Sequence, residues 1–181
     1  MEWSNAQGFG LISRVIHWAM ALGILVMLGL GTLLENLQPG LANLWLYGLH
    51  KTVGISLLGL VVLRLVWHRI TPPPPPIGGV PLWQQRLALW VHRAFYLLLL
   101  AVPLSGWVAS SATGIEVMFA DRWVLPALAP ASEAWEKAGF AVHGWLTKLL
   151  MALVLLHVAG ALKRALAGDG TLRRMVTGKT K

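Results

Sequence analysis

Cysteine is absent from this chain of 181 residues. Without cysteine, the chain can form no disulfide framework and no cysteine-ligated iron–sulfur cluster. It also lacks the C-x-x-C-H motif that attaches haem covalently. Any redox chemistry of this protein therefore uses other ligands.

Charged residues are scarce, at 12% of the chain against about 25% in ordinary soluble domains. Hydrophobic residues make up 56%, and the mean hydropathy is +0.65. This composition excludes an ordinary soluble protein and predicts one that is embedded in a membrane.

Four windows are apolar over a length that crosses the hydrocarbon core of a bilayer, which takes about 20 helical residues. They are residues 11–34, 44–67, 87–110 and 139–162. The first window is too long for the core of a signal peptide and lacks a cleavage pattern, so we interpret it as a retained helix. We therefore predict an all-α membrane protein with one domain, residues 1–181, built as a bundle of four transmembrane helices.

The connections between these windows differ in character. Residues 35–43 are few enough to make the first two helices antiparallel neighbours. The linker "HRITPPPPPIGGVPLWQQ" cannot continue a helix and is expected to run partly as extended polyproline. The 28-residue connection 111–138 has a mixed composition, and we expect a short surface helix or cap there.

The basic residues indicate the orientation. One side of the membrane receives eleven of them: Arg14, Arg64, Arg69, Arg86, Arg93, Lys163, Arg164, Arg173, Arg174, Lys179 and Lys181. The other side receives four: Lys51, Arg122, Lys137 and Lys148. The positive-inside rule then predicts that both termini and the proline linker are cytoplasmic. This topology accounts for the net charge of +8 without a nucleic-acid partner, and the basic tail, residues 163–181, is expected to lie against anionic lipid headgroups.

Histidines within the apolar windows are the main functional signal, because ionisable residues inside a membrane are costly and usually functional. His143 and His157 are 14 residues apart, which places them on one face of a helix with about 21 Å between them along its axis. By depth, His143 is level with His50 on the outer side, and His157 is level with His17 on the inner side.

Two imidazole pairs at separate depths match the needs of two haems, because a haem iron accepts one axial nitrogen on each face of its large apolar ring. Zinc or copper is a poorer match, since such sites normally gather three or four ligands. For any single histidine, a hydrogen bond to a neighbouring helix is an equally good explanation. The matched set of four favours two b-type haems stacked across the bilayer.

Two further histidines, His92 and His68, lie outside these two pairs. His92 lies at nearly the depth of His17, so depth alone leaves it open as the inner ligand or as a partner of a haem propionate. His68 lies at the end of the second window among arginines, and we expect it at the interface with no ligand role.

Cations near the helix ends are candidate partners for anionic propionates. They are Arg14, Lys51, Arg64, Arg93 and Lys148. Lys51 and Lys148 are of most interest because basic residues are scarce on the outer side, where either would attract a small anion. Snorkelling to the interface explains each of them equally well.

Glycines within the windows would let a cofactor ring or a neighbouring helix approach the backbone closely. They are Gly23, Gly29, Gly54, Gly59, Gly106 and Gly160.

Several segments taken together resemble the bacterial cytochrome b561 family of four-helix, di-haem inner-membrane proteins. These segments are "SRVIHWAMA", "LHKTVGISLLGLVVLRLVWHRITPPPPP", "HRAFYLLLLAVPLSGW", "VHGWLTKLLMALVLLHVAGALKR" and "DGTLRRM". The resemblance covers nearly the whole chain and is weakest in the 28-residue outer connection. It implies ligands from the first, second and fourth helices, namely His17, His50, His143 and His157, and so favours His17 over His92.

The resemblance also implies a function. It predicts a multi-pass protein of the bacterial inner membrane that passes electrons between the periplasmic face and ubiquinone or menaquinone, with superoxide or a periplasmic redox protein as donor. It implies an oxidoreductase without a catalytic acid or base.

The alternative function is that of a haem b anchor subunit of a larger dehydrogenase or hydrogenase, and a homodimer remains open. A histidine-lined transporter is disfavoured, because the windows hold no carboxylates to complete a path.

Overall fold

Four long helices dominate the computed structural model, which describes residues 3–5, 8–77, 79 and 81–179. They are α1 (Leu11–Glu35), α2 (Leu44–Ile70), α3 (Leu82–Ala112) and α4 (Glu133–Leu166), and each is long and apolar enough to span a membrane. The prediction of an all-α protein with four transmembrane helices is therefore confirmed. A short helix α5 (Thr171–Thr177) follows α4.

Helices α3 and α4 extend beyond the windows that hydropathy marked. Helix α3 begins five residues before residue 87, and α4 begins six residues before residue 139. The added first turn of α4 is charged, and Lys137 pairs with Glu133 one turn away. Such pairs stabilise an exposed helix end. Hydropathy therefore located the part of each helix that suits lipid, while the helices themselves continue into water.

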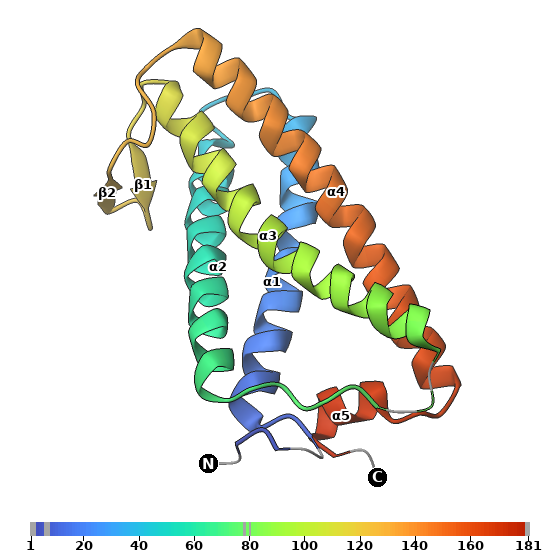
Figure 1. Cartoon of the computed structure of the whole chain (residues 1–181). Coiled ribbons are helices and arrows are strands. Elements are labelled where there is room, and N and C mark those ends of the chain that lie inside the picture. The colour runs from blue at the N-terminus through green and yellow to red at the C-terminus, as the bar shows by residue number, and fades with distance from the viewer. Residues whose placement is uncertain (1–2, 6–7, 78, 80, 180–181) are drawn as a thin grey trace.

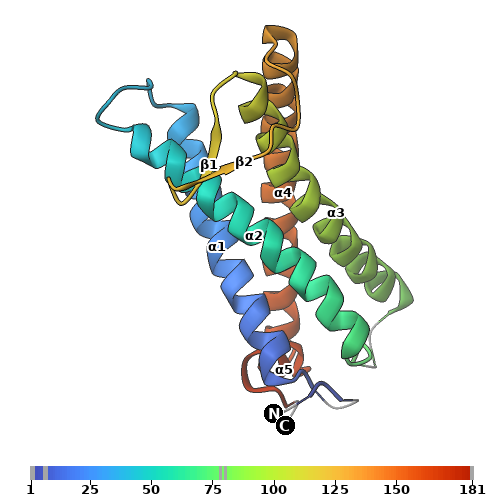
Figure 2. The ribbon, with the colours of Figure 1, turned by 90° about the vertical axis from the view of Figure 1, so that its left-hand side faces the viewer.

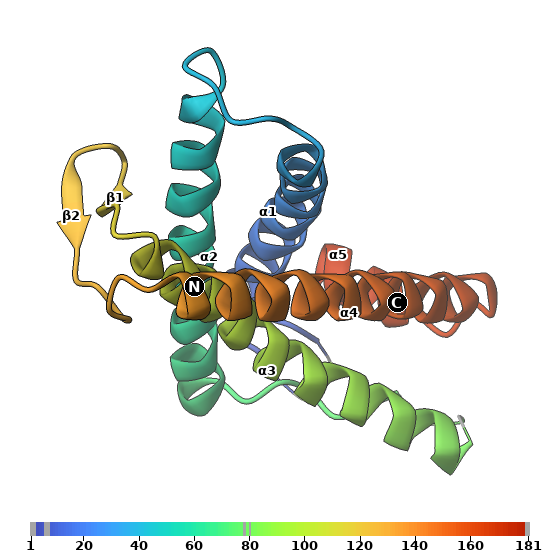
Figure 3. The same cartoon turned by 90° about the horizontal axis from the view of Figure 1, so that it is seen from above.

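The helices pack as two pairs, α1 with α2 and α3 with α4, and α2 joins the pairs by crossing α3 (Figures 1 and 2). Viewed from above, α4 lies across the directions of α1 and α2 without packing closely along either (Figure 3). At the inner end, the tips of α2 and α3 are far apart, and the proline linker spans the distance between them (Figure 1). Both termini lie at this end of the bundle, which is called inner because the basic residues predict it to be cytoplasmic.

Few side chains are fully buried between the helices. The central cluster consists of Ile16, Met20, Ile24, Val61, Leu98 and Leu150. In the most apolar window of each helix, only 6% to 17% of residues are buried. A bundle filled by its own side chains would bury roughly the inward apolar stripe of each helix. Most side chains in these windows therefore face outward or are only partly covered by neighbouring helices.

The outer connection does not form the surface helix that we expected. It forms an antiparallel hairpin of β1 (Val117–Phe119) and β2 (Trp123–Leu125), with Val117 paired to Leu125. The turn has positive φ at Ala120 (53°) and Asp121 (50°), as in type I′ turns that normally carry Asn-Gly. Of the two forms expected, a surface helix or a cap, the helix is wrong because Val-Met-Phe and Trp-Val-Leu favour strands, while the turn lacks its usual sequence signal.

The C-terminal segment closes the inner end of the bundle. Arg14 donates a hydrogen bond to the carbonyl of Val176 (2.7 Å), and the indole of Trp18 donates to the carbonyl of Met175 (3.1 Å). Arg174 is buried and donates to the carbonyl of Pro75 in the linker (2.9 Å). The expectation that the whole basic tail faces lipid headgroups is therefore wrong for Arg174, which holds the tail against the protein.

Candidate functional site

The outer histidine pair joins two helices that do not pack closely on each other. The rings of His50 on α2 and His143 on α4 lie with their centroids 6.2 Å apart and their planes at 81°. An imidazole nitrogen bound to a first-row metal lies about 2 Å from the ion, so two rings that share one metal from opposite sides have centres roughly 6 Å apart. The observed separation fits that arrangement.

A hydrogen bond fixes the orientation of His143. Its Nδ1 lies 2.9 Å from the carbonyl oxygen of Val102 and 3.2 Å from Oγ of Ser105. When Nδ1–H donates to a carbonyl, the other nitrogen, Nε2, keeps its lone pair for a metal. The same carbonyl also accepts from Oγ of Ser105 over 2.8 Å.

Glycines on neighbouring helices leave room for both outer rings. A Cβ added at Gly106 on α3 would lie 3.0 Å from Cε1 of His143. A Cβ added at Gly31 on α1 would lie 3.4 Å from Cε1 of His50. Sequence inspection indicated Gly106 but missed Gly31. A Cβ added at Gly29, Gly59 or Gly160 would have no protein atom within 4 Å.

His50 also has an unsatisfied polar atom. Its Nδ1 is buried and has no hydrogen-bond partner among the described residues. A buried polar group without a partner carries a free-energy cost, so such an atom in a native protein points to a group that it serves when loaded. Together with the ring separation, this fits a metal-bearing cofactor between His50 and His143.

The inner histidine pair has a similar arrangement, nearer the end of the bundle that is predicted to be cytoplasmic. His17 on α1 and His157 on α4 have ring centroids 6.4 Å apart. His92 on α3 also reaches this level, and its ring centroid lies 5.5 Å from that of His157. Nδ1 of His92 is 2.7 Å from the carbonyl of Ala88. The separation between His17 and His157 is closer to that of two rings on one metal than the separation between His92 and His157.

Arg64 lies within this inner cluster. Its Nη1 donates to Nδ1 of His17 over 3.2 Å, and its Nε is buried without a partner among the described residues. A neutral imidazole that accepts at Nδ1 carries its hydrogen on Nε2, so this bond and metal binding through Nε2 exclude each other. In the described part of the chain, no carboxylate forms an ion pair with Arg64.

The other candidate cations have different surroundings. Lys148 lies 3.6 Å from Glu35 at the end of α1, and both side chains are mostly exposed. Arg93 stacks over Trp90 at 5.3 Å, while Arg14 binds the C-terminal segment as described above. Lys51, next to His50, forms no ion pair with any described residue. Among the described residues, Lys51 is thus an outer cation with no carboxylate partner.

No group of three or more described histidine or carboxylate side chains converges on one point. The donors come as pairs, which is the number that fills the two axial positions of a porphyrin-bound iron.

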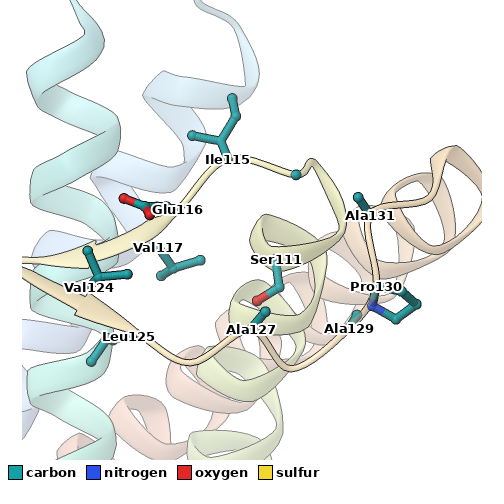
Figure 4. Close-up of a pocket in the computed structure, with 11 residues that line it drawn as sticks. Ser111, Ile115, Glu116, Val117, Val124, Leu125, Ala127, Ala129, Pro130 and Ala131 are labelled. Atoms are coloured by element: carbon teal, nitrogen blue, oxygen red, sulfur yellow. The ribbon is translucent and has the colours of Figure 1, made fainter.

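An outer cavity of about 410 Å³ lies beneath the hairpin, between β1, β2 and the start of the connection to α4 (Figure 4). Its lining is mainly small or apolar, with Ser111 and Glu116 as the polar side chains. It has no histidine, lysine or arginine, and so lacks the groups that would bind an anion.

Comparison with known proteins gives two matches. A sequence model described as prokaryotic cytochrome b561 matches residues 8–178. A protein of Escherichia coli (strain K12) named cytochrome b561 homolog 2 is 34% identical over 182 residues, which cover 97% of this chain and 95% of that protein.

Proposed function

The chain belongs to the prokaryotic cytochrome b561 family, and we propose that it holds two haems b and transfers electrons from a donor at the outer face of the membrane to quinone. As a family member, it is a multi-pass protein of the bacterial inner membrane that binds haem b and transfers electrons. The number of haems, the ligands, the quinone and the donor belong to the proposal.

One observation carries the proposal: two histidine pairs, each drawn from two helices, with ring separations of 6.2 and 6.4 Å. His50 and His143 would hold the outer haem, and His17 and His157 the inner one. The spacing of 14 residues on α4 sets the two levels about 21 Å apart. The edges of two haems at these levels would be closer than their centres, which suits electron transfer between them.

Haem iron supplies one-electron redox chemistry when it is bound. The four imidazoles would occupy both axial positions at each level, so they leave no open position for a substrate. The surrounding leucines, valines and isoleucines exclude water and keep the site apolar. Electrons would therefore enter and leave without a bond between substrate and iron.

Arg64 would change partner when the inner site is loaded. Its bond to Nδ1 of His17 blocks the coordinating tautomer, as argued above. A propionate is the anionic partner that a buried guanidinium requires. Moving from His17 to a propionate would free the imidazole and neutralise the charge in one step.

Superoxide is the donor that a cation beside His50 in the chain, unpaired among the described residues, favours. Lys51 adjoins His50 and has no acidic partner among the described residues. Two superoxide ions would be oxidised to dioxygen, and their two electrons, with two protons, would convert one quinone to quinol. Small anions are drawn to such a local positive field.

Rapid mixing tests this function. The oxidised, haem-loaded protein would be mixed with superoxide, and the reduced protein with ubiquinone and menaquinone analogues, while the haem absorbance is followed. We expect reduction in the first case and reoxidation in the second. A Lys51→Gln variant should be reduced more slowly by superoxide and reoxidised normally. No reoxidation by any quinone would overturn the proposal.

A further inference from the structure

A second polar pair lies between α2 and α3 in the inner half of the bundle, outside the set of proposed ligands. The hydroxyl of Tyr96 is 2.9 Å from Nδ1 of His68, and the two rings meet edge to face with centroids 6.3 Å apart. The sequence alone placed His68 at the interface without a role. The structure instead gives it a specific partner on another helix.

One polar hydrogen of the His68–Tyr96 pair has no acceptor among the described residues. A neutral histidine and a tyrosine carry two polar hydrogens, one on the imidazole and one on the hydroxyl, and the bond between them uses one. The second remains, whichever residue donates. Nε2 of His68 is buried and has no partner among the described residues. The pair therefore presents one unused donor, which requires an acceptor.

The pair lies beside the central apolar cluster, and Arg64 is one helical turn from His68. Trp67 and Phe95, the neighbours of His68 and Tyr96 in the chain, pack against the central cluster. The inner tips of α2 and α3 are far apart, and the linker spans them (Figure 1). Arg174 holds that linker at Pro75. The pair therefore has apolar neighbours along both helices.

The pair also lies close to the inner redox level. His68 is one helical turn from Arg64, and Arg64 contacts His17. A molecule bound at the pair would be near the inner end of the proposed electron path and on the same side of the membrane as the proline linker.

We infer that His68 and Tyr96 form the hydrogen-bonding end of the quinone site and donate to a carbonyl oxygen of the quinone headgroup. A quinone carbonyl is a pure acceptor on a flat apolar ring, which is the combination that one buried donor in an apolar setting selects. This inference rests on the proposed function, because it supplies the binding site for the acceptor named there.

Binding of decylubiquinone to the oxidised, haem-loaded full chain in detergent tests the inference without turnover. Quenching of tryptophan fluorescence reports the Kd. Tyr96→Phe and His68→Gln should each weaken binding about tenfold, the effect of one lost hydrogen bond. Tyr47→Phe is the matched control, because Tyr47 is the other tyrosine of the chain and bonds Leu37 in the outer connection. It should bind as wild type.

The haem spectrum of each variant identifies any loss of fold, and reoxidation by quinone separates the two proposals. If wild type is reoxidised by quinone but both variants bind decylubiquinone as wild type does, a water satisfies His68 and the inference is wrong while the function stands. If wild type neither binds quinone nor is reoxidised by it, both fail. If Tyr96→Phe loses its haems, the comparison of His68→Gln with Tyr47→Phe decides.

Discussion

At the scale of single residues, the hydrogen-bond partner of Nδ1 distinguishes His143 in the outer pair from His17 in the inner pair. His143 has its Nδ1 bonded to a carbonyl, so its other nitrogen is ready for a metal. His17 has its Nδ1 occupied by Arg64 and must lose that partner first. Loading of the inner site therefore requires a rearrangement that His143 does not need.

Alanine substitutions should separate His17 from His92 as the inner ligand. Removing a true axial ligand leaves the iron held from one side, so His17→Ala should reduce the haem content from about two to about one per chain. His92→Ala should retain both, because its ring lies 5.5 Å from that of His157, which fits two rings on one metal less well than the 6.4 Å between His17 and His157. A pyridine haemochrome assay measures the ratio, and the reverse pattern would assign the inner ligand to His92.

Gly106→Ala should disturb the outer site. The added methyl group would lie 3.0 Å from Cε1 of His143, and such overpacking costs about 1–3 kcal/mol. We expect roughly tenfold weaker haem retention at the outer level, measured as haem lost to excess apomyoglobin. Gly29→Ala is the control, since a Cβ there meets no atom within 4 Å. Equal retention in both variants would contradict the assigned role of Gly106.

The sequence predicted the histidine pairs but not what orients them. Spacing along α4 and depth in the windows were sufficient to match His143 with His50 and His157 with His17, because helix geometry is regular. The carbonyl of Val102 could not be foreseen as the partner of His143, since every residue has a carbonyl and the contact is made between two helices. The contact of His68 with Tyr96 was not foreseen for a related reason: Tyr96 lies on another helix.

At the scale of elements, apolar length predicted the four helices well because lipid imposes a nearly fixed length on each span. It could not predict where α3 and α4 begin, as their first turns lie in water and follow helix propensity. The hairpin was not predicted because its turn, Ala120 and Asp121, has residues that rarely take positive φ.

The hairpin tip is anchored near the outer histidine. The backbone N–H of Ala120 donates to Oγ1 of Thr52 (3.0 Å), two residues from His50. Positive φ costs a residue with a Cβ about 1–2 kcal/mol, and the side chain of Ala120 is exposed. Ala120→Gly should therefore stabilise the protein by about 1 kcal/mol, whereas Thr52→Val should destabilise it by a similar amount through the lost hydrogen bond.

Thermal unfolding in detergent, followed by circular dichroism, measures both changes. The two variants should shift Tm in opposite directions. A lower Tm for Ala120→Gly would show that the turn does not hold the strained geometry described here.

At the scale of the whole molecule, the two ends of the bundle are built differently. The inner end is tied together by Arg14, Trp18 and Arg174 through α5. The outer end carries a hairpin, a cavity and an exposed pair of Lys148 and Glu35. A donor would meet the outer end, and the anchor-subunit alternative predicts that a periplasmic enzyme co-purifies with the chain in fixed ratio.

The haem content of the purified full chain is the most direct test of the central claim. The measurement combines the air-oxidised and dithionite-reduced absorbance spectra with a pyridine haemochrome assay and a protein determination. The two histidine pairs predict two b-type haems per chain, with sharp reduced bands typical of iron bound by two imidazoles. One haem per chain, or none, would contradict the account.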